Sequence, residues 1–191
     1  MLQNFPYKIV LASKSPRRQF LLKELGLDFE LRTKEVEEDF PDDLKREQIP
    51  LYLCEHKAAA FNDELAEDEL IITADTIVWV NHKVLNKPAD KIEAVEMLTE
   101  LSGTMHEVYT GVCLLTKHKK RVFFDKTEVY FKELSAEEIA FYIDKYSPYD
   151  KAGAYGAQEW IGYVAIDKIV GSYFNVMGLP VHKLYEQLRQ F

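Results

Sequence analysis

The most constraining feature of this sequence is an almost continuous apolar run, LIITADTIVWV, at residues 70–80. Because the run is rich in β-branched residues, it predicts a strand buried on both faces, as in the interior of a sheet. Asp75 interrupts it at the centre, and an ionised carboxylate costs roughly several kcal/mol to bury without a metal, a cation or hydrogen-bond donors. The run therefore predicts either a functional carboxylate or a bulge or strand end at which Asp75 only caps a turn.

The segments around this run predict a mixed sheet. Strand patterns lie at 8–12, 27–34, 107–116, 121–131 and 161–169, and helical patterns begin at Pro16, near 48, after Asp90, after Ser135 and at Pro180. Helices and strands alternate in the first half, whereas hairpin-like strands cluster in the second. A mixed α/β or α+β fold therefore fits better than a purely parallel sheet.

Length and composition predict one folded domain over residues 1–191. A chain of this size with 47% hydrophobic residues can bury one substantial core or two small lobes. It has no low-complexity stretch that would indicate a flexible linker. Cys54 and Cys113 lie among apolar neighbours with neither a disulfide framework nor a zinc spacing, so both are expected in the core.

Charge and hydropathy bear on partners and location. Thirty-two acidic residues against 24 basic ones give a net charge of -8, which disfavours nucleic acid as a partner. No stretch approaches the roughly 20 apolar residues of a membrane span, and the first residues lack the pattern of a secretion signal. We therefore expect a cytoplasmic protein that binds no membrane.

Basic side chains at the start of the first helix are candidate phosphate contacts. The segment SKSPRRQF joins a strand to this helix and places Arg17 and Arg18 in its opening turn. Cations there oppose the positive end of the helix dipole, and an arriving anion would relieve the conflict. The alternative is that Ser15-Pro16 is only a cap and that both arginines are solvated.

Further charged residues could join Asp75 and the arginines in one site. The acidic run of Glu35, Glu37, Glu38 and Asp39 could supply a second carboxylate to a cation, and oxygen ligands without a His/Cys cluster favour Mg²⁺ or Mn²⁺. Lys57 on the apolar stripe of its helix, Lys87 in VLNKPAD and Lys151 in DKAGAYG could hold a triphosphate. The alternatives are a solvated acidic loop and lysines that extend from apolar faces to water.

A glycine-containing segment, DKAGAYGAQEW, is a candidate for base recognition. Gly153 and Gly156 permit close backbone approach, and Gln158 offers both a donor and an acceptor that could meet a pyrimidine edge. The segment matches neither a Walker A loop nor a dinucleotide fingerprint. Alternatively, it is only a turn before a strand.

Six strings of the sequence, in order, resemble the Maf family of nucleotide pyrophosphatases. They are SKSPRR, ADT, LNKP, DKTEV, DKAGAYGAQ and GSYFNVMGLP, and the match runs from about residue 8 to residue 188. The resemblance implies a two-lobed fold similar to that of inosine triphosphate pyrophosphatases, with a central mixed sheet, an active-site cleft between the lobes and usually a homodimer. It also implies metal-dependent hydrolysis of a nucleoside triphosphate to the monophosphate and pyrophosphate.

The same resemblance implies roles for individual residues. Asp75 resembles the catalytic base and a metal ligand, and Glu37 resembles a metal-associated carboxylate. The residues expected to bind substrate are Ser13, Arg17, Lys57, Thr76, Lys87 and Gln158. Arg17, Thr76 and Gln158 resemble the signature of the branch that acts on dTTP and UTP; the alternatives are the 7-methyl-GTP branch and a nucleotide-sensing regulator of septum formation. Glu159 replaces the family's usual glycine, which leaves the base preference less defined than the reaction.

Overall fold

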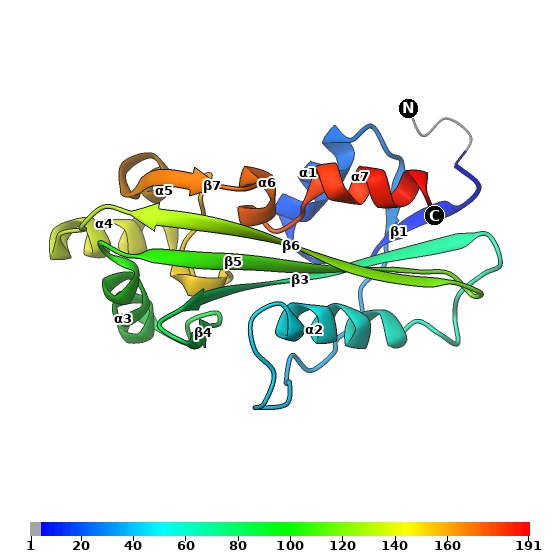
Figure 1. The fold of residues 1–191 in the computed structure, drawn as a ribbon, viewed down its shortest axis with the longest axis horizontal. Coiled ribbons are helices and arrows are strands. Elements are labelled where there is room, and N and C mark those ends of the chain that lie inside the picture. Colours follow the sequence, from blue (N-terminus) through cyan, green and yellow to red (C-terminus); the bar gives the residue numbers. More distant parts are fainter. Residues whose placement is uncertain (1–4) are drawn as a thin grey trace. The chain divides into compact units, whose positions relative to one another are not determined.

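The computed structural model describes residues 5–191, which form a mixed α/β fold around a seven-stranded sheet (Figure 1). The strands are β1 (Lys8–Leu11), β2 (Phe29–Leu31), β3 (Glu69–Val80), β4 (Lys83–Leu85), β5 (Met105–Leu115), β6 (Lys120–Phe131) and β7 (Ile166–Val170). The helices are α1 (Pro16–Glu24), α2 (Gln48–Ala59), α3 (Lys91–Leu101), α4 (Ala136–Tyr146), α5 (Trp160–Ala165), α6 (Tyr173–Val176) and α7 (Val181–Arg189), with a short 3-10 helix at Ala152–Ala154.

The sheet has the strand order β2-β1-β3-β5-β6-β7, and β4 pairs with β3. Strand β1 is parallel to both β2 and β3, whereas β4 and β7 run antiparallel to their partners. This confirms the predicted mixed sheet. In the part of the chain that the structure describes, no helix has the length and apolar character needed to span a membrane.

The chain forms two compact units, each built from separate segments. The first contains the residues up to Asp75 together with Thr110–Asp125 and Gly178–Phe191, and the second contains Thr76–Tyr109 and Lys126–Met177. Strands β3, β5 and β6 contribute residues to both units. Because neither unit is a single stretch of sequence, one domain over 1–191 stays the prediction.

The first unit covers its strands with helices on both faces. Helix α2 lies on one face and α1 and α7 lie on the other (Figure 1). The α2 side has a core that includes Cys54, Ala58, Ile71 and Cys113, which confirms both cysteines as core residues. A Cβ on Gly111 of β5 would lie 2.3 Å from the Pro50 carbonyl oxygen, so this glycine allows α2 to approach the sheet closely.

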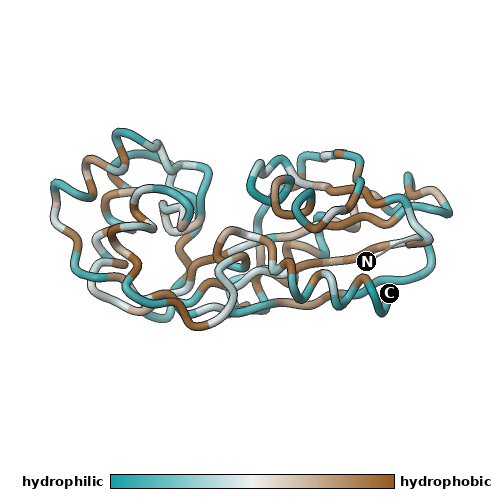
Figure 2. The backbone as a smooth tube through the Cα atoms, turned by 90° about the horizontal axis from the view of Figure 1, so that it is seen from above, coloured by the Kyte–Doolittle hydropathy of each residue, from teal (hydrophilic) through white to brown (hydrophobic). Residues whose placement is uncertain are grey.

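The second unit has its own core between α3, α4, α5 and the strands, with fully buried Leu98 and Tyr142. Ser135 and Glu138 form a capping box at the start of α4, and Asp90 caps α3 by accepting from the Glu93 amide at 2.9 Å. Coloured by hydropathy, the chain places apolar stretches in the interior of each unit and hydrophilic stretches at the outer turns (Figure 2).

One predicted strand is wrong over its first half. The segment 161–169 begins as helix α5, and only Ile166–Val170 forms a strand. A Cβ on Gly162 would lie 1.9 Å from the Ala157 carbonyl oxygen, so the helix packs directly onto the backbone of the preceding turn. The sequence pattern of such a short apolar segment does not distinguish a helix from a strand.

Candidate active site

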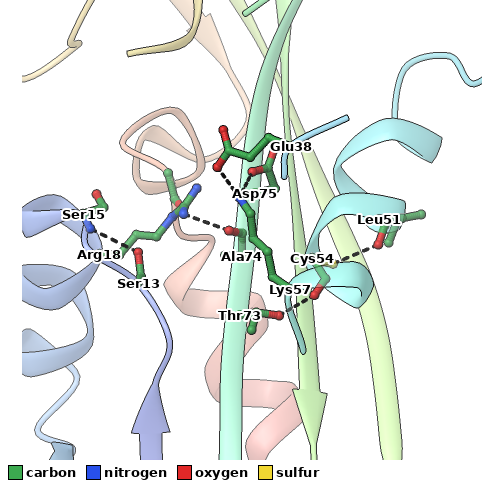
Figure 3. A network of polar contacts seen from close by, with 11 residues as sticks. Ser13, Ser15, Arg18, Glu38, Leu51, Cys54, Lys57, Thr73, Ala74 and Asp75 are labelled. Carbon is green, nitrogen blue, oxygen red and sulfur yellow. Dashed lines mark hydrogen bonds and ion pairs between the residues drawn. The ribbon is translucent and has the colours of Figure 1, made fainter. Parts of the chain in front are cut away.

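Three charged side chains from distant segments meet in the first unit. The Lys57 Nζ atom lies 2.7 Å from Glu38 Oε1 and also donates to Asp75 Oδ1 (Figure 3). The side chains of Lys57 and Asp75 are only 17% and 11% exposed, whereas that of Glu38 is 45% exposed. One ammonium group therefore joins a buried carboxylate to a carboxylate that solvent can reach.

The packing of α2 against β3 places Lys57 beside Asp75. Lys57 follows the buried residues Leu53 and Cys54 on the inner face of α2, as its apolar stripe predicts. The Thr73 hydroxyl donates to the Cys54 carbonyl at 2.6 Å, two residues before Asp75 on the strand. This buried hydrogen bond fixes the helix to the strand next to the ion pair.

Arg18 supports the strand from the opposite side (Figure 3). Its Nε donates to the Gly178 carbonyl and its Nη1 donates to the Ala74 carbonyl, both at 2.8 Å. Burial lowers the pKa of the Arg18 guanidinium, and the negative charge of Asp75 opposes that shift. Arg18 thus holds the backbone immediately before Asp75.

Comparison with known proteins gives this arrangement its context. The sequence matches the family described as Maf-like protein over residues 8–191. The chain belongs to the Maf-like family. A dTTP/UTP pyrophosphatase of Phocaeicola vulgatus is 55% identical over 192 residues, and one of Parabacteroides distasonis is 53% identical over 193; each alignment covers 100% of both chains. Among solved structures, the Ham1 protein of Staphylococcus aureus has a TM-score of 0.49 at 16% identity, covering 94% of this chain and 99% of that one.

The structure separates the predicted site residues of this Maf-like chain into two groups. Ser13, Arg17, Glu37, Lys57 and Asp75 belong to the first unit, and Thr76, Lys87 and Gln158 belong to the second. In the first group, the contacts join Lys57 and Asp75, and Ser13 is buried with its Oγ accepting from the Ser15 amide at 3.2 Å. Glu37 is exposed, and the carboxylate that contacts Lys57 belongs to its neighbour Glu38.

Two candidates of the second unit have different surroundings. The Lys151 Nζ lies 2.6 Å from Asp150 Oδ1 and 3.1 Å from Glu159 Oε1, and its side chain is only 8% exposed. Lys151 therefore forms ion pairs with two carboxylates of its own unit. Gln158 Oε1 is buried and accepts no hydrogen bond from residues 5–191.

The donor set around Asp75 suits a hard divalent cation. Asp75 and Glu38 present carboxylate oxygens to a single positive charge, and oxygen is the ligand that Mg²⁺ and Mn²⁺ prefer. Within residues 5–191 no cluster of three or more His, Cys, Asp or Glu side chains could hold a metal. A cation bound here would therefore take at most the two carboxylates of Asp75 and Glu38, and its remaining ligands would be water and phosphate oxygens.

Proposed function

We propose that this chain hydrolyses dTTP and UTP to the nucleoside monophosphate and pyrophosphate. The observation that carries the proposal is the buried Asp75 carboxylate, which is paired with the Lys57 ammonium group. The same ammonium group also contacts Glu38. This arrangement occurs in a member of the Maf-like family whose full-length relatives are named dTTP/UTP pyrophosphatase. Hydrolysis of an anhydride between phosphates needs a base and positive charge near the phosphates; Asp75 is the proposed base, and the Lys57 ammonium supplies one positive charge beside it.

In the proposed reaction, Asp75 accepts a proton from a water molecule while the water oxygen attacks the α-phosphorus. The bond between this phosphorus and the oxygen that bridges to the β-phosphate breaks, and pyrophosphate leaves with that oxygen. The Lys57 ammonium, which lies beside the proposed base Asp75, attracts the phosphate oxygens as their charge grows. A divalent cation on Asp75 and Glu38 would supply further charge neutralisation when bound.

Six side chains complete the proposed assignment. Arg17, Lys57 and Lys87 contact phosphates, Ser13 adds a hydroxyl near them, and Thr76 and Gln158 set the base preference. The assignment is supported by the resemblance of their motifs and, for Lys57, by its contact with Asp75. Glu37 stays the predicted second carboxylate from the resemblance, and we add Glu38 as a candidate because it contacts Lys57.

A substrate panel tests the reaction. The purified protein is assayed with dTTP, UTP, CTP, GTP and 7-methyl-GTP at equal concentration, with and without Mg²⁺ or Mn²⁺, and with Asp75→Asn as the inactive control. Metal-dependent release of pyrophosphate from dTTP and UTP is expected. Turnover of 7-methyl-GTP alone would assign the chain to the other branch, and nucleotide binding without turnover would favour a sensor.

The adjacent glutamates offer a matched test of the second carboxylate. Glu37→Gln and Glu38→Gln remove the same charge from neighbouring exposed positions, but only Glu38 contacts Lys57. Glu38→Gln should weaken Mn²⁺ binding in calorimetry, and Glu37→Gln should leave it near the wild-type value. The reverse order would favour Glu37 as the ligand.

We also propose that the chain acts in the cytoplasm, where nucleoside triphosphates are abundant, and as a homodimer. The dimer is supported by the family resemblance. Sedimentation analysis of the purified chain should give twice the mass of 22.2 kDa. A monomer at concentrations where the enzyme is active would contradict the dimer without affecting the reaction.

A further inference from the structure

Gln158 lies inside a tight turn of the second unit. The Glu159 amide donates to the Gly156 carbonyl at 2.9 Å and closes the turn around Gln158. The Gln158 Oε1 atom is buried and has no hydrogen-bond donor among residues 5–191. Because a buried acceptor without a partner costs about 1–3 kcal/mol, a ligand N–H placed opposite it would recover that loss.

The carboxylate of Glu159 contacts two other side chains of the second unit, Tyr142 and Lys151. Its Oε2 accepts a hydrogen bond from the Tyr142 hydroxyl, and the same hydroxyl accepts from the Gly156 amide at 3.0 Å. Its Oε1 lies 3.1 Å from the Lys151 Nζ. Tyr142 is fully buried on α4, so the network anchors the turn to the core of the unit.

Two glycine contacts show how closely the turn is packed. A Cβ on Gly156 would lie 2.9 Å from the Glu159 Cδ and 3.1 Å from the Gln158 Nε2, so both side chains cover this glycine. Gly162 of α5 packs in the same manner on the Ala157 carbonyl. The Gln158 Nε2 atom and the Glu159 carboxylate therefore both lie against the same side of Gly156.

The negative charge of Glu159 favours this orientation of the Gln158 amide, with the NH₂ group toward the carboxylate and the oxygen away from it. Orientation matters because a half-turn of the amide exchanges its donor and its acceptor. Uracil and thymine present an N3–H donor beside a carbonyl acceptor, whereas cytosine presents a ring-nitrogen acceptor beside an amino donor. An amide free to rotate would therefore recognise both types of base.

We propose that Glu159 is a positioning residue that fixes the orientation of the Gln158 amide and thereby sets the preference for uracil and thymine over cytosine. The inference rests on the proposed function, in which Gln158 recognises the base. Glu159, which stands where the family usually has glycine, would thereby have a role in specificity. Lys151 and Tyr142 share this role because they hold the Glu159 carboxylate in place.

The test compares Glu159→Gln, which keeps the shape but removes the charge, with Tyr142→Phe, which removes the hydroxyl between Glu159 and Gly156. The control is Glu96→Gln, which removes one charge from an exposed position of the same unit. For each protein, kcat/KM is measured with UTP and CTP, and the thermal midpoint is recorded. Both test variants should lower the UTP-to-CTP ratio by about 5- to 50-fold, and the control should leave it unchanged.

The outcomes separate this inference from the proposed function. A ratio that stays at the wild-type value in both test variants, or a parallel loss with both nucleotides, would show that Glu159 only supports the fold. If Glu159→Gln fails to fold, the ratio for Tyr142→Phe decides. A wild-type enzyme without preference for UTP over CTP would overturn the inference alone, whereas a wild type without turnover would overturn the proposed function.

Discussion

The ion pair between Lys57 and Asp75 makes a measurable prediction about energetic coupling. Lys57→Met and Asp75→Asn each remove one charge with little change in volume, and the double variant completes a thermodynamic cycle. Lys91 and Asp144 provide a matched control, since they form the same type of contact but their side chains are 55% and 60% exposed. The corresponding values for Lys57 and Asp75 are 17% and 11%.

Burial decides the expected magnitudes. A hydrogen bond to a charged group in a partly buried site contributes about 1.5–3 kcal/mol net, so the Lys57–Asp75 coupling should fall in that range. Exposed ion pairs contribute about 0–1 kcal/mol, which is the range expected for Lys91–Asp144. With a denaturant slope of about 2 kcal/mol per molar urea, the buried coupling corresponds to roughly 1 M in the unfolding midpoint.

The assay is urea unfolding followed by far-ultraviolet circular dichroism, with EDTA present so that no metal binds between the carboxylates. Each single variant, each double variant and the wild type are measured under the same conditions. Equal couplings for the buried and the exposed pair would refute the reasoning. A Lys57–Asp75 coupling below about 0.5 kcal/mol would also refute it, because the two side chains would then not stabilise each other.

Three further predictions concern catalysis, the arginine pair and pH. Asp75→Asn should lower kcat by at least about 10²-fold, and near-normal turnover would remove Asp75 from the mechanism. Arg17→Ala should lower kcat/KM by about 10- to 10³-fold with an unchanged thermal midpoint. Arg18→Lys should instead lower the free energy of unfolding by about 1–3 kcal/mol. A loss of stability in the Arg17 variant and a loss of activity alone in the Arg18 variant would exchange the two roles. Burial lowers the pKa of His106 from 6.5 to about 3, so the unfolded chain binds this proton first and stability falls as pH decreases below 6.5. From pH 7 to pH 5 the wild type should lose about 2 kcal/mol more than His106→Phe, and equal losses would contradict the shift.

Much of the fold follows from local sequence patterns. The run at 70–80 predicts β3 because a continuous β-branched segment has few alternatives, and the capping residues Asp90 and Ser135 mark the starts of α3 and α4. Helix α5 is different, because no side chain caps its first turn, and Gly162 near its start packs closely on the Ala157 carbonyl. A contact of that kind has no periodic signal in the sequence.

The site was predictable where a charge interrupts an apolar pattern. Asp75 stands out in a buried strand and Lys57 stands out on a buried helical face, and the structure joins these two residues. The acidic loop offers no such pattern, so its sequence gives no reason to choose Glu38 over Glu37. The role of Glu159 depends on Tyr142, whose hydroxyl reaches it from another element, and sequence alone carries no sign of that contact.

The buried pair itself supports the proposed chemistry. Replacing a buried ion pair by apolar residues of similar volume is often neutral or stabilising, so a buried pair such as Lys57 and Asp75 is weak evidence for a purely structural role. The neighbouring residues Cys54, Ala58 and Ile71 already form an apolar core there. Glu38, which is 45% exposed, keeps one side of the pair open to solvent. The exposed member of the group is a carboxylate, which agrees with the proposal that a cation bound there helps to neutralise the phosphates of the substrate.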